Sequence, residues 1–412
     1  MTDTSKSTKN IEAVYPLSPM QEGMIFHSLY EPDERYYFEQ FSCTIIGDLD
    51  VQAFQLAWEK IIDRHAILRT SFVWKSQDQM LQVVHKQVEL PFDFLDWRDF
   101  SAEKQEEQLS QYLLREREVG FNLVKAPLVR LALIQKEAEA YYFVWSYHHA
   151  LLDGWSQPLL LNELITAYEA LSQGKELPLG PVRPYKNYID WIKKQDITKA
   201  ESYWRRVLHG FNAPTPLVVT RKQEVSQKHG KHLEKSLYLD TEITQKIISL
   251  ARENDLTINT IILGAWSILL SRYSGEDKVL FGATVSGRPP ELAGSDTMIG
   301  LFINTLPMGV AIPGEETVIS WLNELQTQQV EMRAYEYTPL VKIKEWSEIP
   351  GGESIFNSIL IFENYPVDPS KIGLNQSISI EDIQISERAN YPLSLVAALG
   401  DELFMKVVYD ER

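Results

Sequence analysis

Apolar and polar positions alternate along the chain in a way that predicts strands and helices in succession. Residues 141–147 (YYFVWSY) are aromatic and β-branched, which favours a strand. Shortly after them, apolar residues recur at helical spacing and predict one buried helix face: Leu160, Leu164, Tyr168 and Leu171. Gly174 is a plausible stop for this helix. The stretch YHHALLDGWS at residues 147–156 must therefore form a tight connection from strand to helix.

The two halves of the chain repeat one pattern. Residues 57–65 (AWEKIIDRH) and 265–273 (AWSILLSRY) share the form A-W-x-x-[IL]-[IL]-x-R-[HY]. Each predicts a helix that buries its Trp and aliphatic residues, and each precedes a strand-like segment, ILRTSFVW or KVLFGATV. A match between two amphipathic helices is weak by itself. It nevertheless suggests two related α+β lobes with a cleft between them, and clefts between lobes are common ligand sites.

Segments rich in Gly, Pro and polar residues mark the breaks between elements. Residues 173–184 (QGKELPLGPVRP) contain three prolines and two glycines, which prevent a regular helix or a central strand. We therefore place the domain boundary there, with lobes at 1–180 and 181–412. The polar stretches 220–232 (TRKQEVSQKHGKH) and 350–354 (PGGES) are predicted to be exposed loops.

Composition and charge narrow the class of protein. With 412 residues, 44% apolar and 11% aromatic, the chain can bury a large core in two or more lobes. A formal charge of −17 and a pI near 5.0 argue against binding nucleic acid, which needs clustered Lys and Arg. Cys43 is the single cysteine, and the start MTDTSKSTKN lacks the apolar core of a signal peptide, so a reducing cytoplasm fits. The most apolar window, 258–270, is too short to span a bilayer and predicts a buried helix.

The strand-to-helix turn carries the candidate chemistry. A neutral imidazole there could accept a proton from a substrate near pH 7, because the ordinary pKa of histidine is about 6.5. Asp153 could hold the turn by pairing with an arginine, and Gly154 lets the backbone approach a ligand closely. Backbone N–H groups at the helix start could favour a developing oxyanion. Together these are the parts of an acyl-transfer site.

Simpler interpretations of the same residues remain beside that one. Adjacent side chains on a strand point to opposite faces, so at least one of His148 and His149 is expected to be structural. The pair makes a poor metal site, because the two rings cannot easily bind one ion and the chain has neither a Cys cluster nor an HExxH spacing. A serine hydrolase lacks support too, since no G-x-S-x-G elbow follows a strand.

The stretch HHALLDG matches the H-H-x-x-x-D-G signature of condensation domains of nonribosomal peptide synthetases, in the superfamily of chloramphenicol acetyltransferase and carnitine acyltransferases. Six further segments resemble the other motifs of this family, and they occur in the family's order. They are SPMQEGMIFH (18–27), RHAILRTSF (64–72), YKNYIDWI (185–192), IGLFINTLP (299–307), YEYTPL (335–340) and NYPLSL (390–395). The resemblance therefore extends over nearly the whole chain.

This resemblance implies an α+β fold of two chloramphenicol acetyltransferase-like lobes, arranged as a V-shaped pseudo-dimer with the active-site tunnel between them. The acceptor aminoacyl α-amine would attack a donor aminoacyl or peptidyl thioester, each presented on the 4′-phosphopantetheine of a carrier protein. The implied partners are donor and acceptor peptidyl carrier protein domains and an adjacent adenylation domain, without nucleic acid or membrane. No cofactor need be bound by the domain itself. Family members usually continue with a further helical segment after the last residues, FMKVVYDER.

The resemblance also assigns roles to residues. His149 and Gly154 would be catalytic, with His149 facing the tunnel either as a base or as the group that orients the amine. Asp153 should form a salt bridge, for which Arg288 is the preferred partner. The other implied supports of the active site are His148, Trp204 and, as alternative partners of Asp153, Arg64 and Arg69. Five residues in the matching motifs are expected to line the substrate tunnel: Ser18, Trp155, Asn304, Tyr391 and Ser394.

Finer features indicate the subtype. The segments SPMQEGMIFH and HHALLDGWS and the run FENYP at 362–366 resemble domains that join an L-donor to an L-acceptor. Cyclisation domains replace the histidine signature, which is intact here. Epimerisation domains share the fold and the histidines and are the alternative within the family. A coenzyme A-dependent acyltransferase of the same superfamily and a non-catalytic protein-recruiting domain are the remaining alternatives.

Overall fold

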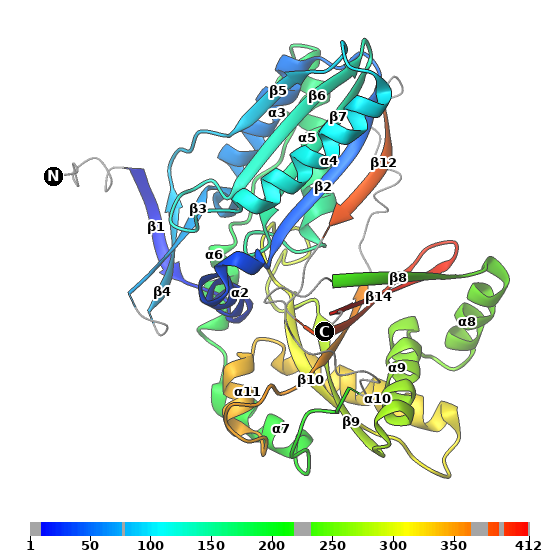
Figure 1. Ribbon diagram of the computed structural model, residues 1–412. Coiled ribbons are helices and arrows are strands. Elements are labelled where there is room, and N and C mark those ends of the chain that lie inside the picture. The colour runs from blue at the N-terminus through cyan, green and yellow to red at the C-terminus, as the bar shows by residue number, and fades with distance from the viewer. Residues whose placement is uncertain (1–9, 76–78, 218–231, 364–377, 387–390, 411–412) are drawn as a thin grey trace. The chain divides into compact units, whose positions relative to one another are not determined.

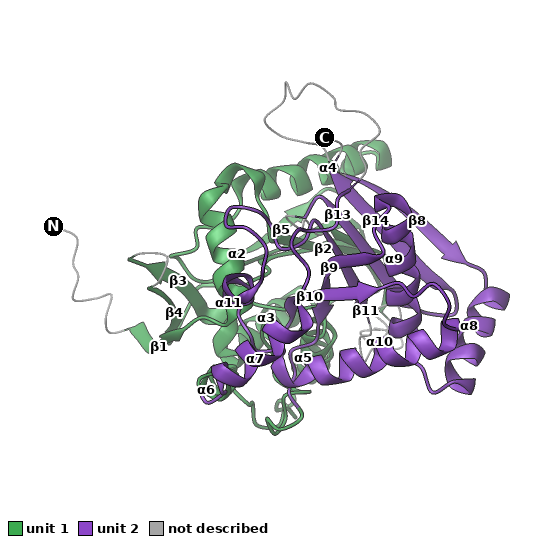
Figure 2. Cartoon of the chain, turned by 90° about the horizontal axis from the view of Figure 1, so that it is seen from below, with its two compact units in different colours: residues 1–193, 290–302, 365–389 green, residues 194–289, 303–364, 390–412 purple. Residues whose placement is uncertain are grey.

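The computed structural model describes residues 10–75, 79–217, 232–363, 378–386 and 391–410 (Figure 1). By contacts between residues, the chain divides into two compact units that are discontinuous in sequence (Figure 2). Unit 1 comprises residues 1–193, 290–302 and 365–389, and unit 2 comprises residues 194–289, 303–364 and 390–412. Contacts alone define these units, so the assignment of residues 1–180 and 181–412 to two related lobes stays a prediction.

Unit 1 is built on a five-stranded sheet in the order β12-β2-β7-β6-β5, in which only the β5–β6 pair is parallel. These strands are β2 (Phe38–Ile46), β5 (Phe92–Asp96), β6 (Val129–Glu137), β7 (Ala140–His148) and β12 (Ser379–Ser386). A smaller antiparallel sheet has the order β1-β4-β3. Its strands are β1 (Ile11–Pro16), β3 (Thr70–Trp74) and β4 (Met80–His85).

Helices cover both faces of the larger sheet in unit 1 (Figure 1). Of these, α3 (Val51–Arg64) and α5 (Ser156–Ser172) lie on one face and α4 (Ala102–Val119) on the other. Unit 1 also contains α2 (Pro19–Tyr30), α6 (Lys186–Ile192) and the 3₁₀ turns η2 (Pro32–Glu34) and η3 (Ala66–Arg69). Tyr142 and Val144 of β7 pack in a cluster with Tyr112 of α4. On the other face of β7, the Phe143 ring packs edge-on against Phe54 of α3. This alternation explains why every residue of β7 is buried.

Unit 2 is built on a six-stranded sheet in the order β10-β9-β11-β13-β14-β8. Its strands are β8 (His232–Leu239), β9 (Lys278–Val285), β10 (Asn304–Ala311), β11 (Ser358–Glu363), β13 (Leu393–Leu399) and β14 (Leu403–Asp410). Only β11 runs parallel to its neighbours, β9 and β13. The helices are α7 (Ile197–Val207), α8 (Thr241–Glu253), α9 (Ile258–Ser274), α10 (Val318–Met332) and α11 (Leu340–Trp346), with the 3₁₀ turn η4 (Arg333–Tyr335).

Most of the elements predicted from the sequence are confirmed. The predicted strand at 141–147 is β7, and the apolar helix after it is α5. This helix ends shortly before Gly174, which adopts a left-handed backbone conformation (φ 63°). The two echoing helices are α3 and α9, and the strand expected at KVLFGATV is β9. The segment ILRTSFVW is a strand only from Thr70 onward, because Ile67, Leu68 and Arg69 belong to the 3₁₀ turn η3.

The predicted breaks also fall between elements. Residues 175–184 contain neither helix nor strand, and the loop expected at 350–354 is irregular and mostly exposed. Of the loop expected at 220–232, residues 220–231 lie outside the described residues, and His232 begins β8. Across the described ranges, none of the helices is long and apolar enough to cross a membrane.

Candidate active site

The histidine turn lies in unit 1, between the end of β7 at His148 and the start of α5 at Ser156. Strand β2 pairs with β7 as far as Phe38 opposite His148, and the backbone N–H of His149 donates to the carbonyl of Tyr37 at 2.8 Å. The sheet therefore holds the backbone at both histidines, and the chain leaves the sheet after His149.

The His149 ring is fixed by its own turn. Its Nδ1 lies 2.7 Å from the carbonyl oxygen of Leu152. Because a carbonyl can only accept, Nδ1 must carry the proton, and the neutral ring then has its lone pair on Nε2. The side chain is only partly buried. His149 thus presents a hydrogen-bond acceptor that a substrate N–H could reach.

His148 has the opposite tautomer and is enclosed. The backbone N–H of Ala150 donates to His148 Nδ1 at 3.2 Å, so the proton is on Nε2, which lies 3.2 Å from Ser28 Oγ. Ser28 in turn donates to the carbonyl of Met24 at 2.8 Å. Burial, and then the neighbouring His149, lowers the pKa of His148 to about 3. His148 is therefore a neutral residue whose hydrogen bonds are satisfied inside the protein.

Asp153 is fully buried and holds two backbone segments together. Its Oδ1 accepts from the backbone N–H of Ser156, the first residue of α5, at 2.9 Å. Its Oδ2 accepts from the backbone N–H of Phe302 at 2.9 Å. The carboxylate therefore joins the turn to the IGLF segment at 299–302, which is far away in the sequence.

Gln21 is a support of the turn that was not predicted from the sequence. It is fully buried, and its Nε2 donates to the carbonyl of Ala150 at 2.9 Å. Its Oε1 accepts from the backbone N–H of Ser18 at 2.9 Å, while Ser18 Oγ accepts from the backbone N–H of Gln21 at 3.3 Å. This reciprocal pair is a capping box at the start of α2. The S-x-x-Q spacing at residues 18–21 is the sequence pattern that could have predicted this capping box.

Arg64 and Arg69 both have glutamate partners in unit 1. Arg64 Nε lies 2.8 Å from Glu163 Oε2, which also lies 2.7 Å from His65 Nε2. Burial by itself would raise the pKa of Glu163, but hydrogen bonds and charge from His65 and Arg64 outweigh it and lower the pKa. The carboxylate at Glu163 thus stays ionised and joins α5 to the end of α3.

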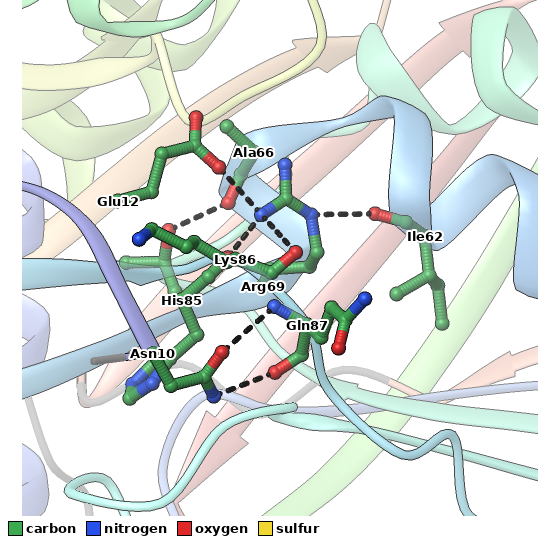
Figure 3. A network of polar contacts seen from close by, with 9 residues as sticks. Asn10, Glu12, Ile62, Ala66, Arg69, His85, Lys86 and Gln87 are labelled. Atoms are coloured by element: carbon green, nitrogen blue, oxygen red, sulfur yellow. Dashed lines mark hydrogen bonds and ion pairs between the residues drawn. The ribbon is translucent and has the colours of Figure 1, made fainter. Parts of the chain in front are cut away.

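Arg69 fastens the smaller sheet to α3 (Figure 3). Its guanidinium contacts Glu12 at 2.8 Å and donates to the carbonyls of Ile62 and Lys86 at 3.2 and 3.3 Å. It also donates to the carbonyl of His85. The structure therefore gives both of the alternative arginines other partners than Asp153.

Arg288 and Asn304 lie in unit 2, near Glu336. The backbone N–H of Gly287, which precedes Arg288, donates to Glu336 Oε2 at 3.0 Å, and burial raises the pKa of that carboxyl to about 7. Asn304 Nδ2 donates to the carbonyls of Glu336 and Thr338 at 2.8 and 2.9 Å. The Asn304 side-chain amide thus binds two backbone carbonyls of its own unit. The pairing of Arg288 with Asp153 stays a prediction.

Three further predicted residues lie in unit 2, on α7, on β13 and in the segment just before β13. Trp204 is fully buried on α7, with its ring edge-on to Tyr203 at 5.0 Å between centroids. Ser394 is buried on β13. Tyr391 packs near Phe356 at 5.5 Å between ring centroids, and burial raises the pKa of its hydroxyl. A lining role in a tunnel stays a prediction for Ser394 and Tyr391.

Two expected residues of the turn, Gly154 and Trp155, directly precede α5. Trp155 Nε1 donates to the carbonyl of Asp296 at 3.0 Å. Within the described part of the chain, the Gly154 N–H makes no hydrogen bond to another residue, so it can serve a ligand. Among those same residues, no cluster of three or more His, Cys, Asp or Glu could hold a metal ion.

Comparison with known proteins identifies the family. Residues 11–412 match the model of the Condensation domain family. One of the linear gramicidin synthase proteins of Brevibacillus parabrevis is 46% identical over 405 residues, covering 98% of this chain and 8% of that protein. Bacitracin synthase 3 of Bacillus licheniformis is 36% identical over 404 residues, covering 98% of this chain and 6% of that protein. The chain therefore spans less than a tenth of the length of these relatives.

Solved structures share the fold at low sequence identity. The starter condensation domain of rhizomide synthetase, as a double mutant with C8-CoA and Leu-SNAC, has a TM-score of 0.79 and 18% identity, covering 99% of this chain and 90% of that one. A four-domain nonribosomal peptide synthetase bound to AMP and glycine has a TM-score of 0.78 and 18% identity, covering 97% of this chain and 31% of that one. These likenesses confirm the predicted two-lobe fold of mixed helices and sheets. The chain belongs to the condensation domain family.

Proposed function

We propose that this domain transfers an aminoacyl or peptidyl group from a donor carrier protein to the α-amine of an aminoacyl group on an acceptor carrier, with His149 and Gly154 at the reacting atoms. The observation that carries the proposal is the tautomer of His149. Its Nδ1 lies 2.7 Å from the Leu152 carbonyl oxygen, which leaves the ring's lone pair on Nε2 for the substrate in this proposal.

The attacking amine needs little help before it attacks. An α-amino group with an ordinary pKa of about 7.7 to 8.0 is already partly neutral near pH 7, so its deprotonation costs only about 1 kcal/mol. When the nitrogen attacks, a C–N bond forms and the nitrogen becomes a strongly acidic ammonium. His149 Nε2 takes that proton, the C–S bond breaks, and the leaving thiolate recovers a proton. His149 thus orients the amine and accepts its proton.

The oxyanion of the tetrahedral intermediate needs a donor, for which we propose the Gly154 N–H. The Ser156 N–H at the start of α5 is already taken by Asp153 at 2.9 Å. The Gly154 N–H has no acceptor among the described residues, and a glycine allows a substrate to come close. In this proposal His148, Asp153, Arg288 and Trp204 support the site without contacting the reacting atoms.

The subtype and the partners also belong to this proposal. We infer an L-donor and an L-acceptor from SPMQEGMIFH and HHALLDGWS, which resemble domains of that class. Carrier proteins would present both substrates on 4′-phosphopantetheine, the domain itself would bind no cofactor, and an adenylation domain would be its neighbour in the synthetase. A cytoplasmic location fits the free, buried thiol of Cys43.

The first test is a dipeptide assay on two separately loaded carrier proteins, followed by intact-protein mass spectrometry. We expect dipeptide on the acceptor carrier with the parent chain and a loss of about 100-fold or more with His149→Ala, the usual range for a lost proton acceptor. His209→Ala is the matched control, because that side chain is 81% exposed and contacts Glu348 on unit 2. Full activity of folded His149→Ala would reject the role of His149.

The same assay separates the alternatives. An epimerisation domain would exchange the donor α-hydrogen for solvent deuterium without any acceptor, whereas the proposed reaction leaves that carbon unchanged. A coenzyme A-dependent enzyme would accept an aminoacyl coenzyme A in place of the donor carrier and would be inhibited by free coenzyme A. A non-catalytic domain would yield no product with any amino-acid pair.

A further inference from the structure

The peptide group between Leu152 and Asp153 is held at both of its ends. Its carbonyl accepts from His149 Nδ1 at 2.7 Å, and its N–H donates to the carbonyl of Gly300 at 3.3 Å. A peptide group is planar and rigid, so its two ends cannot rotate independently. The position of the Gly300 carbonyl therefore also sets the direction of the Leu152 carbonyl, which orients the His149 ring.

Gly300 is positioned by the hydroxyl of Ser156. The Gly300 N–H donates to Ser156 Oγ at 3.1 Å. The same Oγ lies 2.7 Å from Asp153 Oδ1 and 2.8 Å from the Gly300 carbonyl, and its single proton goes to one of these acceptors. Ser156 and Asp153 are both fully shielded from solvent, where such hydrogen bonds are strongest.

The segment around Gly300 is closely seated, so a small change there cannot be absorbed easily. A Cβ added to Gly300 would lie 2.2 Å from Cδ2 of Tyr185. The hydroxyl of Tyr185 donates to the carbonyl of Leu301, and the backbone N–H of Phe302 donates to Asp153 Oδ2 at 2.9 Å. Three consecutive residues are thus fixed by unit 1, and Ser156 is the side chain that joins them to the start of α5.

We propose that Ser156 is a positioning residue for His149. Its hydroxyl holds Gly300, Gly300 holds the Leu152–Asp153 peptide, and that peptide selects the tautomer with the proton on Nδ1 and the lone pair on Nε2. The contact of Asp153 with the start of α5 does not require this hydroxyl, because Asp153 accepts from the backbone N–H of Ser156. The inference rests on the proposed role of His149 in catalysis, but the tautomer itself is measurable without any substrate.

The test is the tautomer of His149 in Ser156→Ala, read from the imidazole ¹⁵N resonances of histidine-labelled full-length protein and assigned with His149→Ala. We expect the parent chain to hold the proton on Nδ1, and Ser156→Ala to show a second population with the proton on Nε2. In the dipeptide assay, kcat should fall about tenfold while KM stays within about twofold, because misplacement of a reacting group lowers the rate of the chemical step.

Ser267→Ala is the matched control. Ser267 is also fully buried, but its hydroxyl donates at 2.7 Å to Leu263 within its own helix, α9, so neither the His149 resonances nor kcat should change. If Ser156→Ala does not fold, Ser156→Cys fills the space with a slightly larger thiol, weakens the hydrogen bonds and should shift the tautomer in the same direction. A folded Ser156 variant with the parent tautomer and the parent kcat would overturn the proposal. If Ser156→Ala shifts the tautomer but the parent chain itself makes no dipeptide, only the proposed function is rejected.

Discussion

At the scale of single residues, two adjacent histidines differ because of what their ring nitrogens contact. His148 accepts from a backbone N–H at 3.2 Å and is enclosed, whereas His149 donates to a carbonyl at 2.7 Å and is partly open. Both contacts involve backbone groups of the same short turn. The tautomer of His148 thus satisfies the packed turn, whereas that of His149 leaves a lone pair on Nε2, although the residue type is the same.

His148 should make the stability of the protein depend on pH. Its pKa is lowered to about 3 by burial and by His149, while the unfolded chain has the ordinary value of about 6.5. The unfolded state therefore binds the proton first, so stability is full above pH 6.5 and is lost as the pH falls toward 3. Between pH 7 and 5.5 this group should cost about 1 kcal/mol of unfolding free energy.

Urea unfolding of the parent chain and His148→Ala at both pH values measures this. The variant should be less stable by roughly 1 to 3 kcal/mol at pH 7, since the Ala150 N–H loses its acceptor. The gap should narrow by about 1 kcal/mol at pH 5.5. Burial also lowers the pKa of His27 and His85, so only the difference between the two proteins isolates His148. Parallel stability curves would show that His148 does not titrate in this way.

At the scale of elements, two glycines inside regular structure differ in the space around their Cα atoms. Gly282 lies inside β9, where an added Cβ would lie 2.6 Å from the Phe356 ring and 2.8 Å from Ile359 Cγ2. Both of these neighbours are buried, so they cannot swing away. Gly23 lies in the middle of α2, where an added Cβ would have nothing within 4 Å.

Alanine at these two glycines should therefore change the unfolding free energy in opposite directions. Gly282→Ala should destabilise the protein by about 1 to 3 kcal/mol, because it overpacks the contact between β9 and its neighbours. Gly23→Ala should stabilise it by roughly 0.5 to 1 kcal/mol, because alanine loses less backbone freedom in a helix. Thermal unfolding of the two variants beside the parent chain measures both. Two shifts of the same sign would contradict this packing difference.

At the scale of the whole molecule, the sequence predicted the elements well, but it did not indicate which backbone groups bind within the site. Strand β7, helix α5 and the turn between them follow from hydrophobic periodicity, and the order of the motifs identified the family. The arginine partner expected for Asp153 stays a prediction. The backbone contacts of this carboxylate, from the N–H groups of Ser156 and Phe302, were not predicted. Every residue except proline carries such an N–H, so no sequence pattern marks the one that will bind.

The two compact units are interleaved along the chain. Residues 290–302 and 365–389 belong to unit 1 although they follow a long stretch of unit 2. The first of these segments supplies Gly300 and Phe302 to the turn, and the second supplies β12 to the edge of the larger sheet beside β2. Long-range pairing of this kind depends on register and packing across the fold, which local periodicity does not encode.

The single cysteine can report on this interleaving. Cys43 is buried on β2 in an apolar cavity that Ile380 and Ile383 of β12 help to line, and burial raises the pKa of its thiol. Because the thiolate is the reactive form, Cys43 should react slowly with a thiol reagent in the full chain. A fragment of residues 1–193 lacks β12 and Phe302, whose backbone N–H donates to Asp153, so its thiol should react at least about 100-fold faster, as expected for a locally opened structure. Kinetics with a chromogenic disulfide measure both rates, and full-length Cys43→Ala gives the background. If the thiol of the fragment were as slow as that of the full chain, residues 1–193 would fold without the later segments, and the interleaving would not be needed to close this core.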